Sequence, residues 1–597
     1  MNFTTNKEVL RSHIIGAGLV GSLLSVHLAS RGESVTIYEK RQDPRKDIGD
    51  GGRSVNLIIT KRGMDALNAV GLGEEALKIS TPVVGRFIHN KVNEIVQPYN
   101  TNKKQNNLSV MRKTLNILLI NHAEKLGVKI CFNEKVHKID LDQRKIEFSS
   151  GSVQGGQVFG CDGVNSICRE AVGGATLEPF PKDYMELSFT DDAPFNKDYL
   201  HIWPRGNEMI MALPNRNQGF TVTWFGDSEV DPDFSINFSE SMKHFRMDKI
   251  SRPSKLLSVK AERWNHEDWL LLLGDACHGI VPFYGQGMNC GFEDITVFFS
   301  ALSKYGRSGA FKNFYRLRKP DTDAIAELSK RNFDIMAKYC ASGEFQAREV
   351  IKRAISIRYP LYQPIYVLVT HTNTPYSLCL KACALENELV KDVTVVDAWM
   401  KEKWMPFLRK HKLVIPCITY DNYLCLNNVL NSQFPVSSCC CEMLFIVMHQ
   451  TVELWMKLLL YEFKLIMPLL ELKNFDAAEQ KLPRIHEVFK VMLQQWNVLL
   501  TMSVEEYSDL RPSLGSASGF QSFQYKELVS CFERLEAMKG EFPSSLMARL
   551  RQLDELHMSW RKVHVIVAEK YIGDDKGTGG SAGVEFLRKR ATRTFFS

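Results

Sequence analysis

Two apolar patterns divide the chain. In its N-terminal part, short apolar runs such as Leu270–Leu273 alternate with longer mixed stretches, and glycine often follows the runs. Short apolar runs bounded by glycine predict buried strands of an α/β fold. In its C-terminal part, apolar residues recur at helical spacing, which predicts helices at 443–465, 482–500, 523–538 and 546–571. We therefore expect an α/β region followed by an all-α region.

The first predicted strand leads into a glycine-rich turn. An apolar run at 13–15 precedes a helical stretch at 22–30 and a second strand at 34–38. Between the first strand and the helix stand the glycines of a G-x-G-x-x-G pattern, Gly16, Gly18 and Gly21. Here the first glycine makes a tight turn, the second admits a pyrophosphate, and the third lets the helix pack closely. Glu39 ends the second strand, where a carboxylate binds ribose hydroxyls. The unit predicts a dinucleotide site.

Two later strands also end in loops that suit a cofactor. Residues 158–160 predict a strand that runs into Asp162, and the apolar run at 270–273 runs into Asp275. A glycine-rich turn then opens the next helix with Gly287, Met288 and Asn289. A carboxylate at a strand end can bind the hydroxyls of a ribityl chain, and a helix N-terminus stabilises negative charge on a reduced flavin. The alternative is an ordinary strand, turn and helix without a ligand.

Composition narrows the class of protein. The 597 residues suffice for two or more domains, and 44% hydrophobic with 24% charged residues is typical of a globular protein. The net charge of +7 is spread along the chain, so we expect no nucleic-acid partner. The 14 cysteines lack paired zinc-site spacings, and no secretory leader is evident, which favours an intracellular protein. No uninterrupted apolar stretch predicts a membrane span.

Longer phrases resemble the kynurenine 3-monooxygenase family over about residues 8–400. They include RFIHN (86–90), LSVMRKTLN (108–116), YLHIWPRG (199–206) and VPFYGQGMNCGFED (281–294). The resemblance implies a Rossmann-type FAD domain with an inserted mixed-sheet substrate domain. It implies FAD and NADPH as cofactors and hydroxylation of L-kynurenine to 3-hydroxykynurenine with dioxygen. It also implies a cytoplasmic location or association with the mitochondrial outer membrane.

The same resemblance supplies site residues. The substrate would contact four residues at matching positions, Arg86, Tyr99, Asn332 and Tyr366. Arg112 would face the cofactor. Because the flavin carries the reaction, we expect no protein side chain as a nucleophile, and we expect His278 to be a packing residue. The stretch at 245–260 is shorter than the family pattern, and the hydrophobic tail of eukaryotic members is missing.

The C-terminal helices carry a second candidate chemistry. On the last predicted helix, His557 and His564 share the apolar stripe, so each is either an iron ligand or a core residue. A glycine-rich loop at 577–583 follows and contains Thr578, whose hydroxyl can bind a carboxylate or ammonium group. The alternative for this loop is a plain linker.

Phrases in this part resemble the tryptophan 2,3-dioxygenase family, haem enzymes that open the indole ring with dioxygen. They are EMLFIVMHQTVELW (442–455), RPSLGSASGFQSFQ (511–524), WRKVH (560–564) and GTGGSAG (577–583). The resemblance implies His564 as the proximal haem ligand and His449 as the distal histidine. It implies that tryptophan contacts Phe445, Arg511 and Thr578. Tyr420 and Tyr423 would reach a neighbour's site in a homo-oligomer formed by the helical domain.

This part departs from its family pattern. Cys440-Cys441-Glu442 replaces His-Asp-Glu, and Val452 replaces a pocket tyrosine. A helical segment is missing between Met538 and Phe542, which we expect to leave apolar faces without partners.

We expect three parts: a monooxygenase domain at 1–385, a linker helix at 386–412 and a shortened dioxygenase-like domain at 413–597. The main hypothesis is a working flavin hydroxylase joined to an impaired haem domain. One alternative is a bifunctional enzyme that also oxidises tryptophan. Others are a helical half that only mediates oligomerisation, and two adjacent genes joined in gene prediction.

Overall fold

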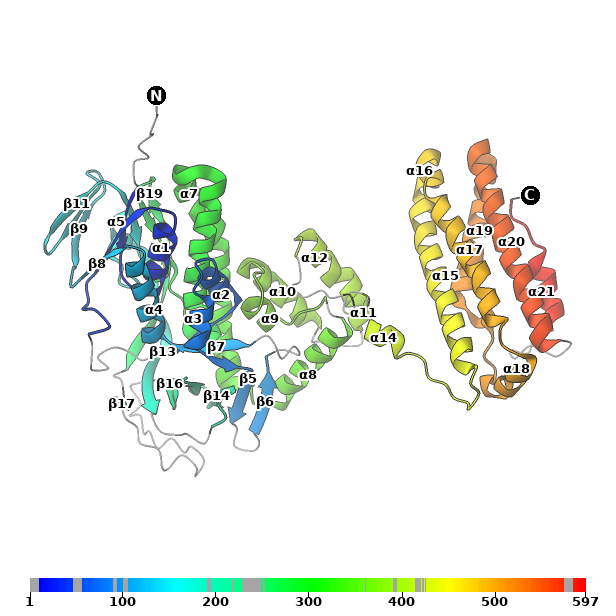
Figure 1. Ribbon diagram of the computed structural model, residues 1–597, viewed down its shortest axis with the longest axis horizontal. Helices are drawn as coiled ribbons and strands as arrows, with labels where there is room; N and C mark the ends of the chain where they lie inside the picture. The colour runs from blue at the N-terminus through cyan, green and yellow to red at the C-terminus, as the bar shows by residue number, and fades with distance from the viewer. Residues whose placement is uncertain are drawn as a thin grey trace. The chain divides into compact units, whose positions relative to one another are not determined.

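The chain divides into two compact units, residues 1–425 and 426–597, shown in Figure 1. The computed structural model describes residues 10–596 apart from 47–55, 90–93, 100–105, 190–194, 217–218, 228–248, 251–252, 360, 390–394, 414–419, 421–423, 425 and 574–582. The boundary between the units lies later than expected, because the residues after 385 pack into the first unit.

A six-stranded sheet forms the nucleotide-binding part of the first unit, in the order β19-β20-β12-β1-β2-β8. The strands are β19 (Asn265–His266), β20 (Leu270–Leu272), β12 (Gln157–Gly160), β1 (Arg11–Ile15), β2 (Ser34–Glu39) and β8 (Lys129–Phe132). All neighbours are parallel except β19 and β20. The central strands are almost wholly buried, as expected for a parallel sheet covered on both faces. The four strands predicted from the apolar runs are confirmed.

Helices pack on this sheet and on one another. They include α1 (Leu19–Ala29), α4 (Arg112–Lys125) and the long α7 (Gly287–Asp334), which Figure 1 shows running along the unit. The backbone of α7 is broken at Gly306, whose φ of 69° lies in the left-handed region that glycine adopts readily. Helix α1 contacts both α4 and α7. The core between sheet and helices therefore fixes the start of α7 relative to the glycine-rich turn.

A second, eight-stranded sheet is mixed, which confirms the expected substrate domain. Its order is β17-β13-β16-β15-β14-β5-β6, and β18 also pairs with β13. Only β14 and β5 are parallel neighbours. The strands are β17 (Lys249–Ile250), β13 (Ala175–Phe189), β16 (Phe220–Gly226), β15 (Met209–Pro214), β14 (Tyr199–Pro204), β5 (Gly85–His89), β6 (Glu94–Pro98) and β18 (Ser254–Ala261). The pairing of β18 with β13 shows that the short stretch near 245–260 still contributes to this sheet.

Two three-stranded sheets and short helices complete the sheet-bearing part. One sheet joins β3 (Asn56–Ile59), β7 (Asn107–Met111) and β4 (Thr81–Val83), and the other joins β11 (Gly151–Gln154), β10 (Lys145–Phe148) and β9 (Val136–Asp140). The helices are α2 (Lys61–Asn68), α3 (Gly73–Lys78), α5 (Ile167–Val172) and α6 (Asp275–His278).

The expected linker at 386–412 is part of the first unit's core. The helices before it are α8 (Gly343–Arg358), α9 (Ile365–Thr370) and α10 (Tyr376–Leu389), whose end overlaps it. The helices within it are α11 (Val396–Trp399) and α12 (Met405–Lys410). Trp399 and Trp404 are buried and pack against Tyr362 at ring separations of 5.9 and 5.1 Å. Burial of two tryptophans stabilises the fold by several kcal/mol, roughly 1.5–3 for each large side chain. This segment is therefore an integral element of the unit.

The second unit is all-helical, as predicted. Its helices are α14 (Leu426–Leu430), α15 (Glu442–Glu471), α16 (Phe475–Glu479), α17 (Leu482–Leu499), α18 (Val504–Leu510), α19 (Phe523–Met538), α20 (Ser544–Ile572) and α21 (Val584–Ala591). Helix α15 is long and apolar enough to cross a membrane by length and composition alone, a test that core helices of soluble proteins also pass. It leaves Met443, Leu454 and Tyr461 exposed.

The C-terminal residues Phe595 and Phe596 pack into the core of the second unit. The Asp554 carboxylate accepts hydrogen bonds from the backbone N–H groups of Phe595 and Phe596 at 2.7 and 3.1 Å. Both rings are 1% exposed, and Phe595 packs 5.3 Å from Phe532. His557 stacks on Phe532 at 4.5 Å and is fully buried, so it is a core residue. The C-terminal residues thus contribute to the same core as Phe532 and His557.

A buried ion cluster connects the strand–loop junction after β20 to α7. Asp294 accepts hydrogen bonds from His278 Nε2 at 2.6 Å, Arg318 Nε at 2.8 Å and the Gly274 N–H at 2.9 Å. Burial alone lowers the pKa of His278, but Asp294 raises it well above its usual value, so the imidazole is charged. His278 therefore has a structural role, as expected.

Replacing Asp294 with Asn should destabilise the first unit strongly. The amide cannot balance the buried charges of His278 and Arg318, a loss of about 3–5 kcal/mol for a broken buried pair. Urea unfolding of the flavin-loaded chain, followed by flavin fluorescence, measures it. Asp323→Asn, which breaks an exposed pair with Lys319, should change the midpoint little. Equal midpoints for the two variants would contradict the structural role of the cluster.

Candidate functional site

The three loops predicted to bind a cofactor lie at one edge of the six-stranded sheet. Strands β20, β12 and β1 are parallel neighbours, so their carboxyl ends and the following loops share that edge. The loop after β1 begins at Gly16, the loop after β12 contains Asp162, and the loop after β20 contains Asp275. The sheet order thus brings together residues that are far apart in the sequence.

The glycines of the first loop have different constraints. Gly16 has φ of +104°, and a Cβ there would lie 2.6 Å from the Cys161 carbonyl oxygen. A Cβ on Gly21 would lie 2.1 Å from the Gly16 carbonyl oxygen. Gly18 has no protein atom within 4 Å of such a Cβ, although it directly precedes α1. Glycine is needed at Gly16 and Gly21 because the chain packs closely there. The open space at Gly18 fits an approaching pyrophosphate.

The groups around Gly18 suit the other parts of a dinucleotide. Helix α1 begins there without a side-chain cap, so its first N–H groups are available to phosphate oxygens. Glu39 Oε2 accepts a hydrogen bond from the Ala17 N–H at 2.8 Å, which brings this carboxylate to the loop. Asp275 is exposed at the start of α6 and accepts no side-chain hydrogen bond from the described residues, and Arg112 is exposed at the start of α4. These residues fit FAD.

Two residues predicted to contact the cofactor have structural partners instead. The Asp162 carboxylate accepts hydrogen bonds from Ser166 Oγ at 2.6 Å and from the Ile167 N–H at 2.8 Å, so it caps α5. The Asn289 side chain is fully buried and bonds to the backbone of Thr60 and Ile58. These bonds hold both side chains in fixed positions. Gly287 and Met288 form the first turn of α7, which has no side-chain cap.

Three of the four predicted substrate residues, Arg86, Tyr99 and Tyr366, converge from different elements. Arg86 lies on β5 and is 6% exposed, Tyr99 follows β6, and Tyr366 lies on α9. The Arg86 guanidinium carbon is 4.8 Å from the Tyr366 ring centre and 5.7 Å from that of Tyr99. The two tyrosine rings stack at 4.7 Å. Asn332 of α7 donates to the Phe283 carbonyl at 2.6 Å, so it holds the turn that precedes α7.

The charge of Arg86 has no acidic partner. Among the described residues, no carboxylate forms an ion pair with it, and its Nε has no hydrogen-bond partner. Burial raises the pKa of Tyr99 and of Tyr366, so both hydroxyls stay protonated at neutral pH. An unpaired buried cation beside two hydroxyl groups is unfavourable unless an anion binds there. The cluster therefore has the charge and the hydrogen-bond donors that a carboxylate needs.

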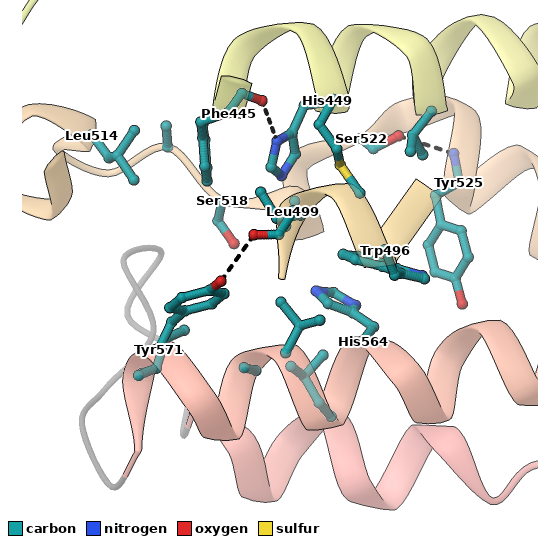
Figure 2. A pocket seen from close by; sticks show the side chains of 18 of the residues that line it. Phe445, His449, Trp496, Leu499, Leu514, Ser518, Ser522, Tyr525, His564 and Tyr571 are labelled. Carbon is teal, nitrogen blue, oxygen red and sulfur yellow. Dashed lines mark hydrogen bonds between the residues drawn. The ribbon is translucent and has the colours of Figure 1, made fainter. Parts of the chain in front are cut away.

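The second unit contains a cavity of about 210 Å³ between its long helices. Figure 2 shows side chains from three helices around it: Phe445 and His449 from α15, Trp496 and Leu499 from α17, and His564 and Tyr571 from α20. Most of the lining is apolar. The structure thus brings together Phe445, His449 and His564, as the sequence predicted.

Both histidines of the cavity are neutral at pH 7. Burial, together with nearby His449, lowers the pKa of His564 to about 4. Burial also lowers the pKa of His449, whose Nδ1 lies 2.8 Å from the Phe445 carbonyl oxygen. His564 stacks on Trp496 at 5.2 Å. A neutral imidazole whose second nitrogen is available is the form that binds a metal ion.

Four further residues were predicted for the dioxygenase-like part: Arg511, Tyr420, Tyr423 and Thr578. Arg511 begins a short 3₁₀ turn and is not among the described residues that line the cavity, although it is close enough to lower the pKa of Tyr507, which does line it. Tyr420 is 75% exposed. Thr578 and Tyr423 lie outside the described residues.

Comparisons with known proteins agree with this division. The FAD binding domain model matches residues 8–310. Kynurenine 3-monooxygenase of Flavobacterium johnsoniae is 34% identical over an alignment of 427 residues, and the match covers 65% of this chain and 94% of that protein. The enzyme of Drosophila willistoni is 33% identical over an alignment of 414 residues, and the match covers 63% of this chain and 90% of that protein. The chain belongs to the kynurenine 3-monooxygenase family. Its first unit is therefore an FAD-dependent monooxygenase.

Residues 410–539 match the tryptophan 2,3-dioxygenase model. The match ends before α20, so His564 lies outside it, and the structure alone places this residue at the cavity.

Among solved structures, Pseudomonas aeruginosa PqsL in complex with 2-aminobenzoylacetate has a TM-score of 0.48 at 17% identity, and the match covers 56% of this chain and 98% of that one. The tetrameric form of 2-methyl-3-hydroxypyridine-5-carboxylic acid oxygenase has 0.48 at 18%, covering 62% and 100%.

Sequence reasoning missed residues that surround the predicted ones. Tyr284 stacks on Tyr366 at 5.9 Å, Asn107 bonds to the Tyr366 hydroxyl, and Trp496 stacks on His564. Tyr284 follows Phe283 in the phrase at 281–294 and could have been found there. No motif marks Asn107, because its position depends on the pairing of β4 with β7.

Gly18→Ala should separate folding from FAD binding. The added methyl meets no protein atom within 4 Å, so the melting temperature of the FAD-free chain should stay close to the parent's. The methyl enters the space assigned to the pyrophosphate, so the Kd for FAD, measured by fluorescence quenching, should rise about tenfold or more. Gly16→Ala is the contrasting variant and should lower the melting temperature. An unchanged FAD affinity in Gly18→Ala would place the pyrophosphate elsewhere.

Proposed function

We propose that this chain hydroxylates L-kynurenine at the ring position next to the aromatic amino group, using FAD, NADPH and dioxygen. The observation that carries the proposal is the buried, unpaired Arg86 beside the protonated hydroxyls of Tyr99 and Tyr366. A guanidinium and two hydroxyl donors match the α-carboxylate of an amino acid. The names of the relatives support kynurenine as that amino acid.

The flavin, when bound, would supply the oxygen-transfer chemistry, and the residues of this chain position the reactants. Gly18, the start of α1 and Glu39 would hold the adenine-nucleotide half, and Asp275 would bind hydroxyls of the ribityl chain. The first N–H groups of α7, which has no side-chain cap, would favour negative charge on the reduced ring. Arg86 would fix the head of the substrate.

An aromatic cluster beside the substrate residues limits water. The centre of the Phe283 ring lies 5.0 Å from the ring centre of Phe180, 5.0 Å from that of Phe225 and 4.7 Å from that of Phe333. Asn332 holds the Phe283 carbonyl at 2.6 Å. An apolar wall strengthens the attraction between Arg86 and a carboxylate by lowering the local dielectric. It also protects a reactive flavin from water.

Arg86→Met should weaken kynurenine binding without weakening the fold. Loss of a buried charge-assisted contact removes about 2–5 kcal/mol, so the KM for kynurenine should rise on the order of 100-fold. The free protein should not lose stability, because an unpaired buried charge disappears. Kynurenine-stimulated NADPH oxidation and thermal melting measure the two effects. Arg144→Met, at an exposed arginine paired with Glu267, should leave both values unchanged. A normal KM in Arg86→Met would exclude the proposed carboxylate site.

A second candidate function concerns the helical unit, because the two neutral imidazoles suit iron. We propose that haem would bind there, held by His564 as the iron ligand, with His449 as a second histidine in the cavity. The haem, when bound, would activate dioxygen for oxidation of tryptophan. The donor set fits this cofactor. The cavity of about 210 Å³ is smaller than the ~300–1,000 Å³ of most ligand sites, so a porphyrin requires its side-chain lining to widen.

His564→Ala should abolish a Soret band that appears when hemin is added to the full-length chain. The matched control is His486→Ala, because His486 bonds to the Arg549 carbonyl and does not line the cavity. The pKa of about 4 means that His564 is available as a ligand at neutral pH, and ligation should be lost as the pH falls toward 4. Absence of a Soret shift in the parent protein would leave the helical unit without this function.

A further inference from the structure

Two buried carboxamides border the Arg86 site. Gln97 is 7% exposed and stands directly opposite Arg86 in the antiparallel pairing of β5 and β6. Because directly opposite residues on neighbouring strands point to the same face, these two side chains share one face of the sheet. Asn107 is 1% exposed, and its Nδ2 donates to the Tyr366 hydroxyl at 2.9 Å. Both amides therefore adjoin residues of the carboxylate site.

Neither amide oxygen is satisfied. Within the described part of the chain, Gln97 Oε1 and Asn107 Oδ1 are buried and accept no hydrogen bond. A buried acceptor without a donor costs about 1–3 kcal/mol, and such groups are few in folded proteins. Two of them beside one cation site indicate a ligand that supplies donors.

The neighbours of Gln97 determine which end of its amide is free. Gln97 Nε2 lies 3.2 Å from Glu349 Oε2. An ionised carboxylate only accepts hydrogen bonds, so the NH₂ group faces Glu349 and Oε1 faces away from it. Glu349 is held in turn by Lys352 at 2.9 Å, and Lys352 also contacts Glu386 at 2.8 Å. This chain of ion pairs keeps the orientation of Gln97 fixed before a ligand binds.

We propose that the amide oxygens of Gln97 and Asn107 bind the α-ammonium group of the amino-acid substrate whose α-carboxylate binds Arg86. The inference rests on the proposed function, in which the substrate is L-kynurenine. The ammonium and the carboxylate are attached to the same carbon, so a carboxylate on Arg86 brings the ammonium to the residues next to it. An ammonium group has three N–H donors and no acceptor, which matches a pair of unsatisfied oxygens.

Neutral amides suit this task better than carboxylates would. An aspartate or glutamate beside Arg86 would form an ion pair with it and compete with the substrate's carboxylate. An amide oxygen accepts from the ammonium and leaves the charge of Arg86 unpaired for the substrate. The arrangement therefore selects a zwitterionic head group over a plain carboxylic acid.

The test compares L-kynurenine with its desamino analogue, which keeps the aromatic ring, the ketone and the carboxylate. Their Kd values are measured by flavin absorbance changes on the full-length, FAD-loaded chain. The variants are Gln97→Met and Asn107→Leu, singly and together, which remove the oxygens while nearly preserving side-chain size. Gln495→Met is the matched control, because Gln495 in the helical unit also has a buried, unpartnered amide oxygen. Retained FAD content shows that each variant is folded.

Kynurenine should bind the double variant about tenfold or more weakly, as expected for hydrogen bonds to a charged group. The desamino analogue should change by no more than about twofold, because it lacks the donor that the oxygens bind. Equal losses for the two ligands, or no loss for kynurenine, would overturn the ammonium site while leaving the proposed function intact. Parent protein that binds neither ligand, and whose NADPH oxidation ignores kynurenine, would overturn both.

Discussion

The close contact between the Gly16 backbone and the Cys161 carbonyl is the constraint on which the flavin unit depends. It holds the turn after β1 against the loop after β12, where a Cβ at Gly16 would be only 2.6 Å from the carbonyl oxygen. Because β20 is the next parallel strand, the loop that begins at Gly274 takes its place at the same edge. The buried Asp294 then ties that loop to α7. Cofactor loops, long helix and substrate residues thus form one connected structure.

Much of the flavin unit follows from local sequence. Strands at 13–15 and 270–273, the glycine turn between the first strand and its helix, and a strand that ends at Glu39 were all predicted from residues adjacent in the sequence. The structure contains each of them. The role of Asp162 could not be read in this way. A carboxylate after a strand can bind a sugar hydroxyl or cap a helix, and the choice depends on where the N–H of Ile167 lies. Local sequence does not contain that distance.

The substrate side depended on pairing between distant strands, and here sequence reasoning supplied Arg86 through family resemblance only. Gln97 stands opposite Arg86 because β5 and β6 pair in one register, and a shift of one residue would turn its side chain to the other face. The linker prediction at 386–412 failed for a related reason. Local sequence did not show that Trp399 and Trp404 would be buried against Tyr362, which lies far from them along the chain.

In the helical unit, the residues that form the core and the residues that line the cavity lie on different parts of α20. Phe595 and Phe596 are buried, and the Phe595 ring packs on Phe532 in the unit's core. His557 belongs to that core, and His564, two turns later on α20, belongs to the cavity. Stability and ligand binding therefore rest on different parts of one helix. The limit on haem is the size of the cavity rather than the integrity of the fold, since the neutral imidazoles are already in place.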